Sequence, residues 1–559
     1  MRSKACSGTS KLLCAVLLIL CLFAGRAWAH KRGDQDAGSV VPLPAPQRTW
    51  QSSGNTTYYV NSLTGSDDAD GKSLAHAWKT LSRVNSGTFA PGDRILLRAG
   101  SHWNGFLSLA GSGTAAHPIQ IDSYDEDASR PGHKPQIDGL GATQATLYLH
   151  NVEYWDIANL DISSRSKRPV AKLTGLLVTL HDFGTAHSIH LTRLDIHDID
   201  GSLVKNSGGN AICISCDGNR VRSRFDDLRI EDCLMSHIDR NGITMGGNWT
   251  RDTWYPSLHV VIRNNRLEDI GGDGIVPTAC DGALVEHNKI LGGRMRCEDS
   301  AAGIWPWSCD NTVVQFNEVS GMRGTNDGQG YDADWNCQNS LFQYNYSHDN
   351  EGGFMLICCD GTSKLPYNIG TTGTIIRYNI SENDGTRTFE ITGPCKDTLI
   401  YNNVLYLGRR NTVANSGAKS SDAANSGSKA KSEKVFVVQA GNWGGPWPED
   451  TRFFNNIFYV EPEASADCNF GQMSGTLFDT NLFFGPLAHR PQDPHTLQAD
   501  PFFFAPGKGI DGYHLRPESP CLHAGRPMLN NGGRDFVGTP IPTVLPPDLG
   551  VFQTLSKNL

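Results

Sequence analysis

Three carboxylates in the middle of the chain have the spacing of an acid–base site. Asp332 and Asp334 stand two residues apart, and Glu390 occupies the corresponding position of a similar segment further on. In glycoside hydrolysis one carboxyl group protonates the departing oxygen while another activates water. Residues two apart on a strand have α-carbons about 6 to 7 Å apart, which fits the roughly 6.5 to 9.5 Å of inverting enzymes slightly better than the roughly 5 Å of retaining ones. We predict that these three acids are catalytic.

Six side chains around the acids are predicted to contact the substrate. The longest connections of this region, 288–309 and 317–337, flank the acids and would form loops that wall a groove. The predicted contact residues are Arg294, Arg323, Asp327, Trp335, His348 and Arg387. Each has a structural alternative, because outward acids are often solvated surface, loop arginines often support the loop, and His348 can hold a turn.

Two further functions stay open at this point. A lyase acting on a uronate polymer needs an unprotonated base beside acid ligands for Ca²⁺, and Lys364, Arg387 or Lys396 could supply that base. A non-catalytic carbohydrate-binding protein would use its tryptophans as the working surface. A hydrolase needs no cofactor, so Ca²⁺ is expected only for the lyase. Convergence of the acids on one site would favour an enzyme.

A repeat indicates the elements that carry these residues. An apolar residue followed three positions later by asparagine recurs at intervals of 23 to 34 residues, at Asn265, Asn288, Asn317, Asn345, Asn379 and Asn403, with weaker versions at Leu160, Leu194, Cys233 and Asn456. Short β-rich segments with unequal insertions predict coils of parallel strands stacked at strand spacing. The recurrent asparagine predicts amide side chains hydrogen-bonded along the stack.

A column of cysteines follows the asparagines and sets which side chains face inward. Its members are Cys216, Cys280, Cys309, Cys337, Cys359 and Cys395. Because side chains alternate along a strand, inward cysteines direct Asp332, Asp334 and Glu390 outward. The same alternation places Trp305, Trp307 and Trp335 inside, unless a local bulge turns some of them outward as a sugar-stacking surface. Stacked cysteines can form disulfides or remain buried thiols.

These patterns resemble the right-handed parallel β-helix superfamily of secreted polysaccharide-active proteins, which has the pectate-lyase-like fold. Residues 58–60, 77–81 and 92–97 are similar to the N-terminal capping helix and first strands of such proteins, and residues 500–521 and 548–550 to their closing segment. The resemblance implies an all-β, right-handed parallel β-helix with an N-terminal capping helix. It leaves the chemistry open, because the fold hosts lyases, hydrolases, epimerases and binding proteins.

The remaining sequence defines the chain's organisation. Residues 1–29 combine basic residues, an apolar run and Ala27-Trp28-Ala29, the order of a secretory signal peptide. Residues 30–57 are predicted to be a flexible lead-in. One β-helix domain is predicted for residues 58–559, with a mobile Ser/Ala/Gly/Lys-rich insertion near 411–434.

Charge and apolar content limit the partners. The chain has 49 Lys and Arg against 58 Asp and Glu, so it lacks the basic footprint of a nucleic-acid-binding protein. No stretch after the leader is apolar enough to span a membrane. We therefore expect a monomer, secreted or periplasmic, that cleaves a polysaccharide, with a hydrolase as the first interpretation.

Overall fold

The computed structural model describes residues 38–125, 133–360, 368–408 and 434–554. The predicted signal peptide, residues 30–37 of the predicted lead-in and residues 411–433 of the predicted insertion lie outside the described residues.

Parallel strands form three long faces of a β-helix. The first face consists of two six-stranded sheets, the second of a sixteen-stranded sheet and the third of a thirteen-stranded sheet. Strands of the first face are β7 (Leu107–Leu109), β10 (Ala145–His150), β14 (Thr174–His181), β17 (Asn210–Asp217), β20 (Asn241–Gly246), β24 (Ile275–Val276), β30 (Gln329–Ala333), β33 (Gly353–Cys358), β37 (Arg387–Thr392), β41 (Val435–Gly441), β44 (Ala466–Asn469) and β47 (Leu487–Ala488).

Strands of the second face are β3 (Thr57–Val60), β5 (Arg94–Arg98), β8 (Ile119–Tyr124), β11 (Trp155–Ala158), β15 (Thr185–Thr192), β18 (Arg224–Glu231), β21 (Ser257–Leu258), β22 (Val261–Arg263), β25 (Cys280–Asp281), β26 (Leu284–Glu286), β28 (Val313–Gln315), β31 (Leu341–Gln343), β35 (Ile375–Arg377), β39 (Leu399–Tyr401), β42 (Arg452–Phe454) and β45 (Leu477–Asp479). Strands of the third face are β6 (His102–Asn104), β9 (Gln136–Asp138), β12 (Asp161–Ser164), β16 (Asp195–Ile199), β19 (Leu234–Ile238), β23 (Arg266–Ile270), β27 (Lys289–Leu291), β29 (Glu318–Ser320), β32 (Tyr346–His348), β36 (Ile380–Glu382), β40 (Val404–Leu407), β43 (Ile457–Val460) and β46 (Leu482–Phe484).

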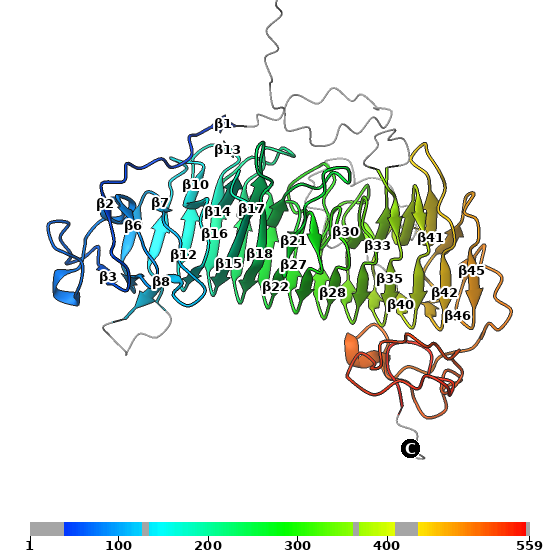
Figure 1. Ribbon diagram of the computed structural model, residues 1–559. Helices are drawn as coiled ribbons and strands as arrows, with labels where there is room; N and C mark the ends of the chain where they lie inside the picture. The colour runs from blue at the N-terminus through cyan, green and yellow to red at the C-terminus, as the bar shows by residue number, and fades with distance from the viewer. Residues whose placement is uncertain (1–37, 126–132, 361–367, 409–433, 555–559) are drawn as a thin grey trace, which may run out of the picture. The chain divides into compact units, whose positions relative to one another are not determined.

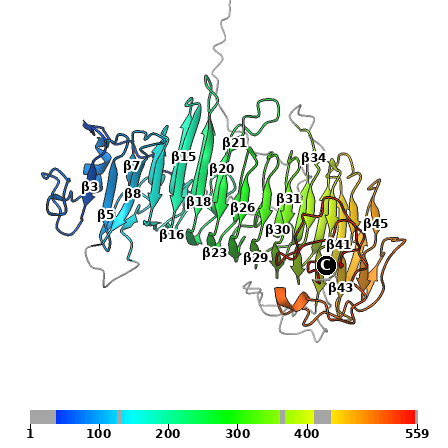
Figure 2. The ribbon, with the colours of Figure 1, turned by 60° about the horizontal axis from the view of Figure 1, so that its bottom comes forward.

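Most coils contribute a strand to each face. In one coil β14, β15 and β16 follow one another along the chain, and they pair in parallel with β17, β18 and β19 of the next coil. Figures 1 and 2 show the colours changing steadily along the stack, because consecutive coils are neighbours. The predicted stack of parallel coils is confirmed.

The predicted asparagine ladder lies at the turn between the second and third faces. Nδ2 of Asn265 donates to Oδ1 of Asn288 at 2.9 Å, and bonds of 2.9 to 3.0 Å continue through Asn317, Asn345, Asn379, Asn403, Asn456 and Asn481. Asp493 ends the ladder by accepting from Asn481 at 2.9 Å. Because these buried amides satisfy one another, the ladder fixes the register of successive coils.

The interior between the faces is apolar and contains the cysteine column. Side chains such as Ile262, Val314 and Ile376 are fully buried, and Cys280 and Cys309 lie among them with no exposed surface. All twelve cysteines from Cys213 to Cys521 are free thiols. The inward direction of the column is confirmed, and of the two alternatives for these cysteines the structure has the free thiols.

The predicted N-terminal capping helix is not found in the described residues. Their one α-helix, α1 (Leu81–Asn85), has five residues and starts at the N-cap Thr80, whose side chain accepts the N–H of Arg83. It ends early because Gly87 and Thr88 pair as β4 (Gly87–Thr88) with β2 (Trp50–Gln51), and a Cβ on Gly87 would meet the Trp50 ring at 2.2 Å. The 3-10 helices are η1 (Leu74–His76) and η2 (Ile510–Tyr513).

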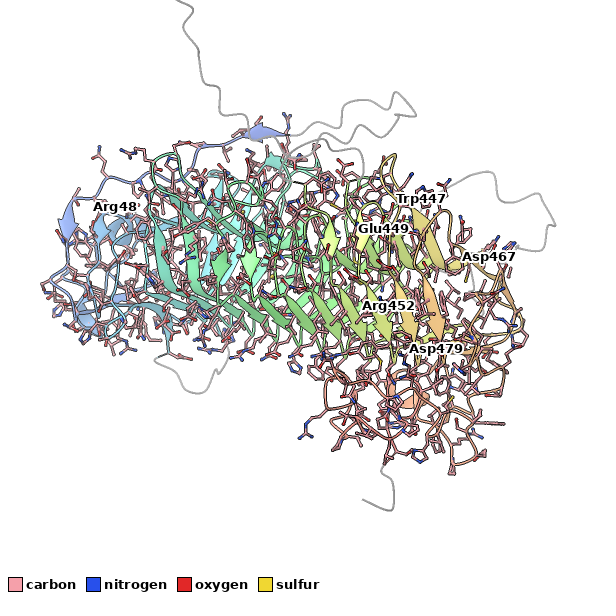
Figure 3. The ribbon with its side chains drawn as sticks, turned by 45° about the vertical axis from the view of Figure 1, so that its right-hand side comes forward. Arg48, Trp447, Glu449, Arg452, Asp467 and Asp479 are labelled. Atoms are coloured by element: carbon pink, nitrogen blue, oxygen red, sulfur yellow. The ribbon has the colours of Figure 1, made fainter. Side chains whose placement is uncertain are left out.

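The described part of the lead-in runs along the first coils. Its β1 (Ser39–Val40) pairs with β13 (Val170–Ala171). A separate two-stranded sheet in the later coils joins β34 (Thr371–Thr372) to β38 (Cys395–Lys396). Nη1 of Arg48 (Figure 3) donates to the carbonyl of Ser108 at 2.9 Å. β1 and Arg48 therefore contact strands of the β-helix, while the flexibility of residues 30–57 stays a prediction.

The closing segment packs beside the later coils. Figure 1 shows the orange and red residues next to β40, β42 and β46. The hydroxyl of Tyr513 donates to Glu382 at 2.8 Å, and Nδ2 of Asn402 donates to the carbonyl of Gly550 at 3.0 Å.

Among the described residues, no helix has the length and apolar character needed to cross a membrane.

Candidate active site

The predicted acids lie on the first face, where β30, β33 and β37 are neighbours. Asp332, Leu356 and Glu390 are register partners on successive coils. The ring of Tyr331 packs against Phe342 of the interior, so strand alternation directs Asp332 outward, as predicted. Only 4% of Asp332 and 8% of Glu390 is exposed. The alternative that these two acids are solvated surface charge is therefore wrong.

Glu390 is held by one charged and one neutral partner. Its Oε2 lies 2.9 Å from Nη1 of Arg387 and accepts a 3.0 Å hydrogen bond from Nε2 of Gln329. Nη2 of Arg387 also donates to the carbonyl of Thr325 at 2.7 Å. Gly353 lies between Gln329 and Arg387, and a Cβ there would meet the Arg387 carbonyl at 1.7 Å. Burial raises the pKa of Glu390, and the charge of Arg387 opposes that rise.

Asp332 is the carboxyl group most disfavoured as an anion. Its Oδ1 is buried and has no hydrogen-bond partner among the described residues. Burial, and then the charges of Asp327, Asp334 and Glu390, raise the pKa of Asp332 well above its usual range. The raised pKa favours the protonated form of this carboxyl group.

Asp334, just after β30, is half-buried and anchored through one oxygen. Oδ1 accepts the backbone N–H of Trp335 at 2.7 Å and the thiol of Cys358 at 2.9 Å. No hydrogen bond reaches its Oδ2 from the described part of the chain. Burial raises the pKa of Asp334 to about 6, and both donors oppose the rise. The free oxygen can therefore face a reacting group while the other is fixed.

Asp327 comes from the loop between β29 and β30. Gly328 follows it with a φ of +82°, and a Cβ on Gly328 would meet two carbonyl oxygens of the same loop at 2.5 and 2.6 Å, so this turn requires glycine. Burial raises the pKa of Asp327 to about 7, with Lys205 opposing the rise and Asp273 adding to it. A carboxyl group with this pKa exchanges its proton near neutral pH.

Sequence reasoning selected neither Lys205 nor Asp273 as a site residue. Oδ1 of Asp273 accepts a 3.0 Å hydrogen bond from the indole Nε1 of Trp305. The charge of Asp273 raises the pKa values of Asp332 and Asp334, and that of Lys205 lowers the pKa of Asp334. No sequence signal pointed to either residue, because Asp273 stands in a glycine-rich turn and Lys205 is about 120 residues before the acids.

Four tryptophans gather beside the acids. Trp335 directly follows Asp334 and stacks on Trp307 with ring centroids 5.0 Å apart. Trp305 and Trp249 approach the Trp307 ring edge-on at 6.0 and 5.6 Å. Trp305 and Trp249 are half-buried. The bond from Trp305 to Asp273 places that indole on the acid side, which agrees with the outward bulge considered above.

The other predicted contact residues differ in their positions. The guanidinium of Arg294 donates to the carbonyls of Asp299, Arg323 and Glu298 at 2.9 Å each, which makes it a support of the loops, the structural alternative given above. His348 is in β32 of the third face and pairs with Asp349 at 2.9 Å, so it does not belong to the acid group. Arg323 is half-buried beside Asp327 in the same loop, and its contact with a substrate stays a prediction.

The candidate bases of a lyase have other partners. Lys364 lies outside the described residues. Nζ of Lys396 pairs with Glu449 at 2.7 Å, and Figure 3 labels Glu449 on the later coils. Arg387 is paired with Glu390. No group of three or more His, Cys, Asp or Glu with the arrangement of a metal site occurs among the described residues.

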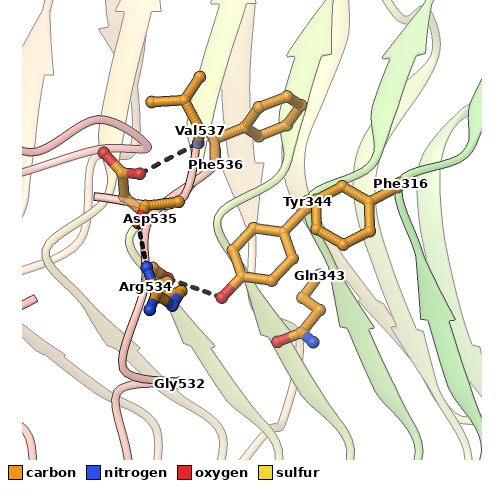
Figure 4. A pocket seen from close by; sticks show the side chains of 9 residues that line it. Phe316, Gln343, Tyr344, Gly532, Arg534, Asp535, Phe536 and Val537 are labelled. Carbon is orange, nitrogen blue, oxygen red and sulfur yellow. Dashed lines mark hydrogen bonds between the residues drawn. The ribbon is translucent and has the colours of Figure 1, made fainter. Parts of the chain in front are cut away.

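Two cavities of the described residues lie away from the acids. One of about 420 Å³ lies between Phe316, Tyr344 and the closing segment at Arg534 to Gly538 (Figure 4). Another of about 290 Å³ lies on the second face around His190. Neither cavity includes an acid of the site, so the site rests on the grouping of its side chains.

Comparison with known proteins supports the fold and relates the chain to carbohydrate-active enzymes. Residues 221–426 match the right-handed β-helix family. A curated protein of Bifidobacterium longum subsp. longum, lacto-N-biosidase, is 26% identical over 615 residues, which cover 90% of this chain and 36% of that protein. This chain therefore spans little more than a third of that relative's length.

Solved structures give the same picture. GH136 lacto-N-biosidase from Eubacterium ramulus is 29% identical with a TM-score of 0.55, covering 63% of this chain and 64% of that chain. The complex of XylC with xylose is 12% identical with a TM-score of 0.51, over 90% and 99% of the two chains, and is alike in fold alone. The predicted right-handed parallel β-helix is confirmed.

Proposed function

We propose that this protein is an exported glycoside hydrolase that releases a neutral disaccharide of the lacto-N-biose type from an oligosaccharide. One observation carries the proposal: Asp327 and Asp334, with pKa values raised to about 7 and about 6, share the electrostatic field of Asp273 and Lys205. Glycoside hydrolysis requires two carboxyl groups at the scissile bond, one that holds a proton and one that is ionised, and both of these groups titrate near neutral pH.

The surroundings of the acids suggest separate roles. Asp327 is the proposed general acid, because a pKa of about 7 lets it hold a proton and deliver it to the leaving oxygen near neutral pH. Asp334 is the proposed carboxylate partner, because its anchored Oδ1 leaves Oδ2 to act on the sugar or on water. Of the three acids predicted to be catalytic, this assignment retains Asp334. It also gives a catalytic role to Asp327, which was predicted to contact the substrate.

The two buried acids of the trio are better suited to support. The raised pKa of Asp332 favours its protonated form, and a protonated carboxyl group limits the negative charge of the site and offers a hydrogen-bond donor. Glu390 is paired with Arg387, whose second contact with Thr325 holds the loop that bears Asp327.

The charge of the site favours a neutral substrate. Five acids gather here, and the nearby cations are engaged: Arg387 pairs with Glu390, and Nζ of Lys205 donates to the carbonyl of Ser300 at 3.2 Å. A uronate would bring another negative charge to a group of five acids, which disfavours its binding. The tryptophan cluster offers the apolar ring surface that sugars bind. The names of the two lacto-N-biosidase relatives supply the disaccharide.

The test compares substrates of different charge and length. The purified mature protein is incubated with p-nitrophenyl glycosides of lacto-N-biose, N-acetylglucosamine and galactose, and with a polyuronate with and without Ca²⁺. Mass spectrometry of the products should show the intact disaccharide with one water added per cleavage. Unsaturated uronate products would establish a lyase instead, and cleavage of the monosaccharide glycosides alone would contradict the disaccharide.

A further inference from the structure

Cys358 stands one residue out of phase with the cysteine column. Cys359 occupies the column register, and its thiol donates to Oδ1 of Asn368 at 3.0 Å. The alternation of β33 therefore turns Cys358 to the opposite side, the side of Leu356 and the acids. Cys358 is 1% exposed, and it meets the acid group instead of the β-helix interior.

The Cys358 thiol meets the carboxylate that the proposed function makes reactive. Its Sγ lies 2.9 Å from Oδ1 of Asp334, the oxygen that also accepts the N–H of Trp335. The hydroxyl of the buried Thr371 lies 2.8 Å from the carbonyl of Cys358 and 3.1 Å from the carbonyl of Asp334. The two strand ends are thus joined through both backbone and side chain.

We infer that Cys358 is a positioning residue for Asp334, fixing Oδ1 so that Oδ2 faces the substrate. The inference rests on the proposed function and deepens it. Burial keeps the pKa of the thiol well above its usual value, so the group stays a donor across the working pH range. A donor to the charged form of an acid favours that form, so the thiol holds the pKa of Asp334 lower than burial alone would set it.

The test is the pH dependence of kcat/KM for three variants. Cys358→Ala removes the donor and should move the acidic limb of the profile upward by roughly one pH unit, with kcat reduced more than KM is raised. Cys358→Ser restores a donor and should return the limb to the wild-type position. Cys359→Ala is the matched control, since it deletes an adjacent buried thiol that does not touch Asp334, and its limb should not move.

The outcomes separate this inference from the function beneath it. An unmoved limb in Cys358→Ala, in a protein whose thermal unfolding midpoint matches that of Cys359→Ala, would overturn the positioning role. If Asp334→Asn retains full activity, the proposed function fails first. If Cys358→Ala does not fold, the acidic limbs of Cys358→Ser and Cys358→Thr are compared instead. The extra methyl group of threonine displaces the donor from Asp334, so the limb of Cys358→Thr should lie higher, and equal limbs would overturn the positioning role.

Discussion

The carboxyl groups of the site differ because each has different neighbours. Asp332 has four acids around it and an oxygen without a partner among the described residues, Glu390 has an arginine, and Asp334 has two neutral donors. The sequence placed Asp332, Asp334 and Glu390 on one side through strand alternation alone. It could not show their burial, because the covering loop is irregular and its position depends on contacts such as Arg387 with Thr325.

The first prediction concerns the pH profile of activity. Asp334 must lose its proton and Asp327 must keep its own, so kcat/KM should rise through about pH 6 and fall above about pH 7. Asp327→Asn should remove the basic limb and lower the rate roughly 10²- to 10⁴-fold on an oligosaccharide. The loss should be smaller on a p-nitrophenyl glycoside, whose leaving group needs little protonation. Equal losses on both substrates would contradict the acid role.

A second prediction concerns stability. The folded-state pKa of Asp332 is raised, so its protonated form favours folding below the unfolded pKa near 4, and that stability is lost as the pH rises through the folded pKa. Asp332→Asn avoids this cost and should raise the thermal unfolding midpoint at pH 7, with the gain shrinking toward pH 4. Asp252→Asn, at an exposed acid between β20 and β21, should show no such pH-dependent gain. A lower midpoint for Asp332→Asn at pH 7 would show that Asp332 is stabilised as an anion.

At the level of elements, the fold could be predicted where one short pattern repeats. The asparagine ladder and the inward cysteines needed only a fixed position in each coil, and both are confirmed. The prediction of a capping helix was wrong, because a repeating pattern does not show where this segment ends. α1 ends where Gly87 meets the Trp50 ring, a contact between residues that are 37 positions apart.

A third prediction tests the ladder. Asn345 donates to Asn379 and to the carbonyl of Val314, and its Oδ1 accepts from the side chain and the backbone N–H of Asn317. Asn345→Ala leaves these buried groups without a hydrogen-bond partner. The free energy of unfolding should fall by about 3 kcal/mol, seen as a lower denaturation midpoint. The exposed Asn219→Ala is the control and should change stability by less than about 0.5 kcal/mol. Similar midpoints for both variants would mean that the ladder does not hold the coils together.

At the scale of the whole molecule, histidines of the earlier coils pair with acids on the outside of the faces. His197 lies 3.0 Å from Asp161 and 2.8 Å from Asp198, and His190 bridges Asp156 and Asp227 at 3.0 Å each. The hydrogen bond to Asp161 is the main cause that raises the pKa of His197 to about 9. These pairs give the β-helix a pH dependence that is separate from that of the active site.

The fourth prediction follows from the raised pKa of His197. Because the folded pKa of His197 lies above the unfolded value near 6.5, its stabilisation is complete below about pH 6.5 and is lost as the pH rises through about 9. His197→Asn should lower the thermal unfolding midpoint at pH 6 and have little effect at pH 10. The exposed His76→Asn, with no acid partner among the described residues, should change the midpoint equally little at both values. A constant deficit for His197→Asn across this range would mean that the charge of His197 does not stabilise the fold.

The most direct test of the central claim is the rate of lacto-N-biose release from its p-nitrophenyl glycoside by the wild type and by Asp334→Asn. The wild type should turn over, and the variant should lose activity by at least about a thousandfold while its unfolding midpoint is unchanged or higher. Full activity in Asp334→Asn would contradict the assignment of this carboxylate and with it the proposed site on the first face.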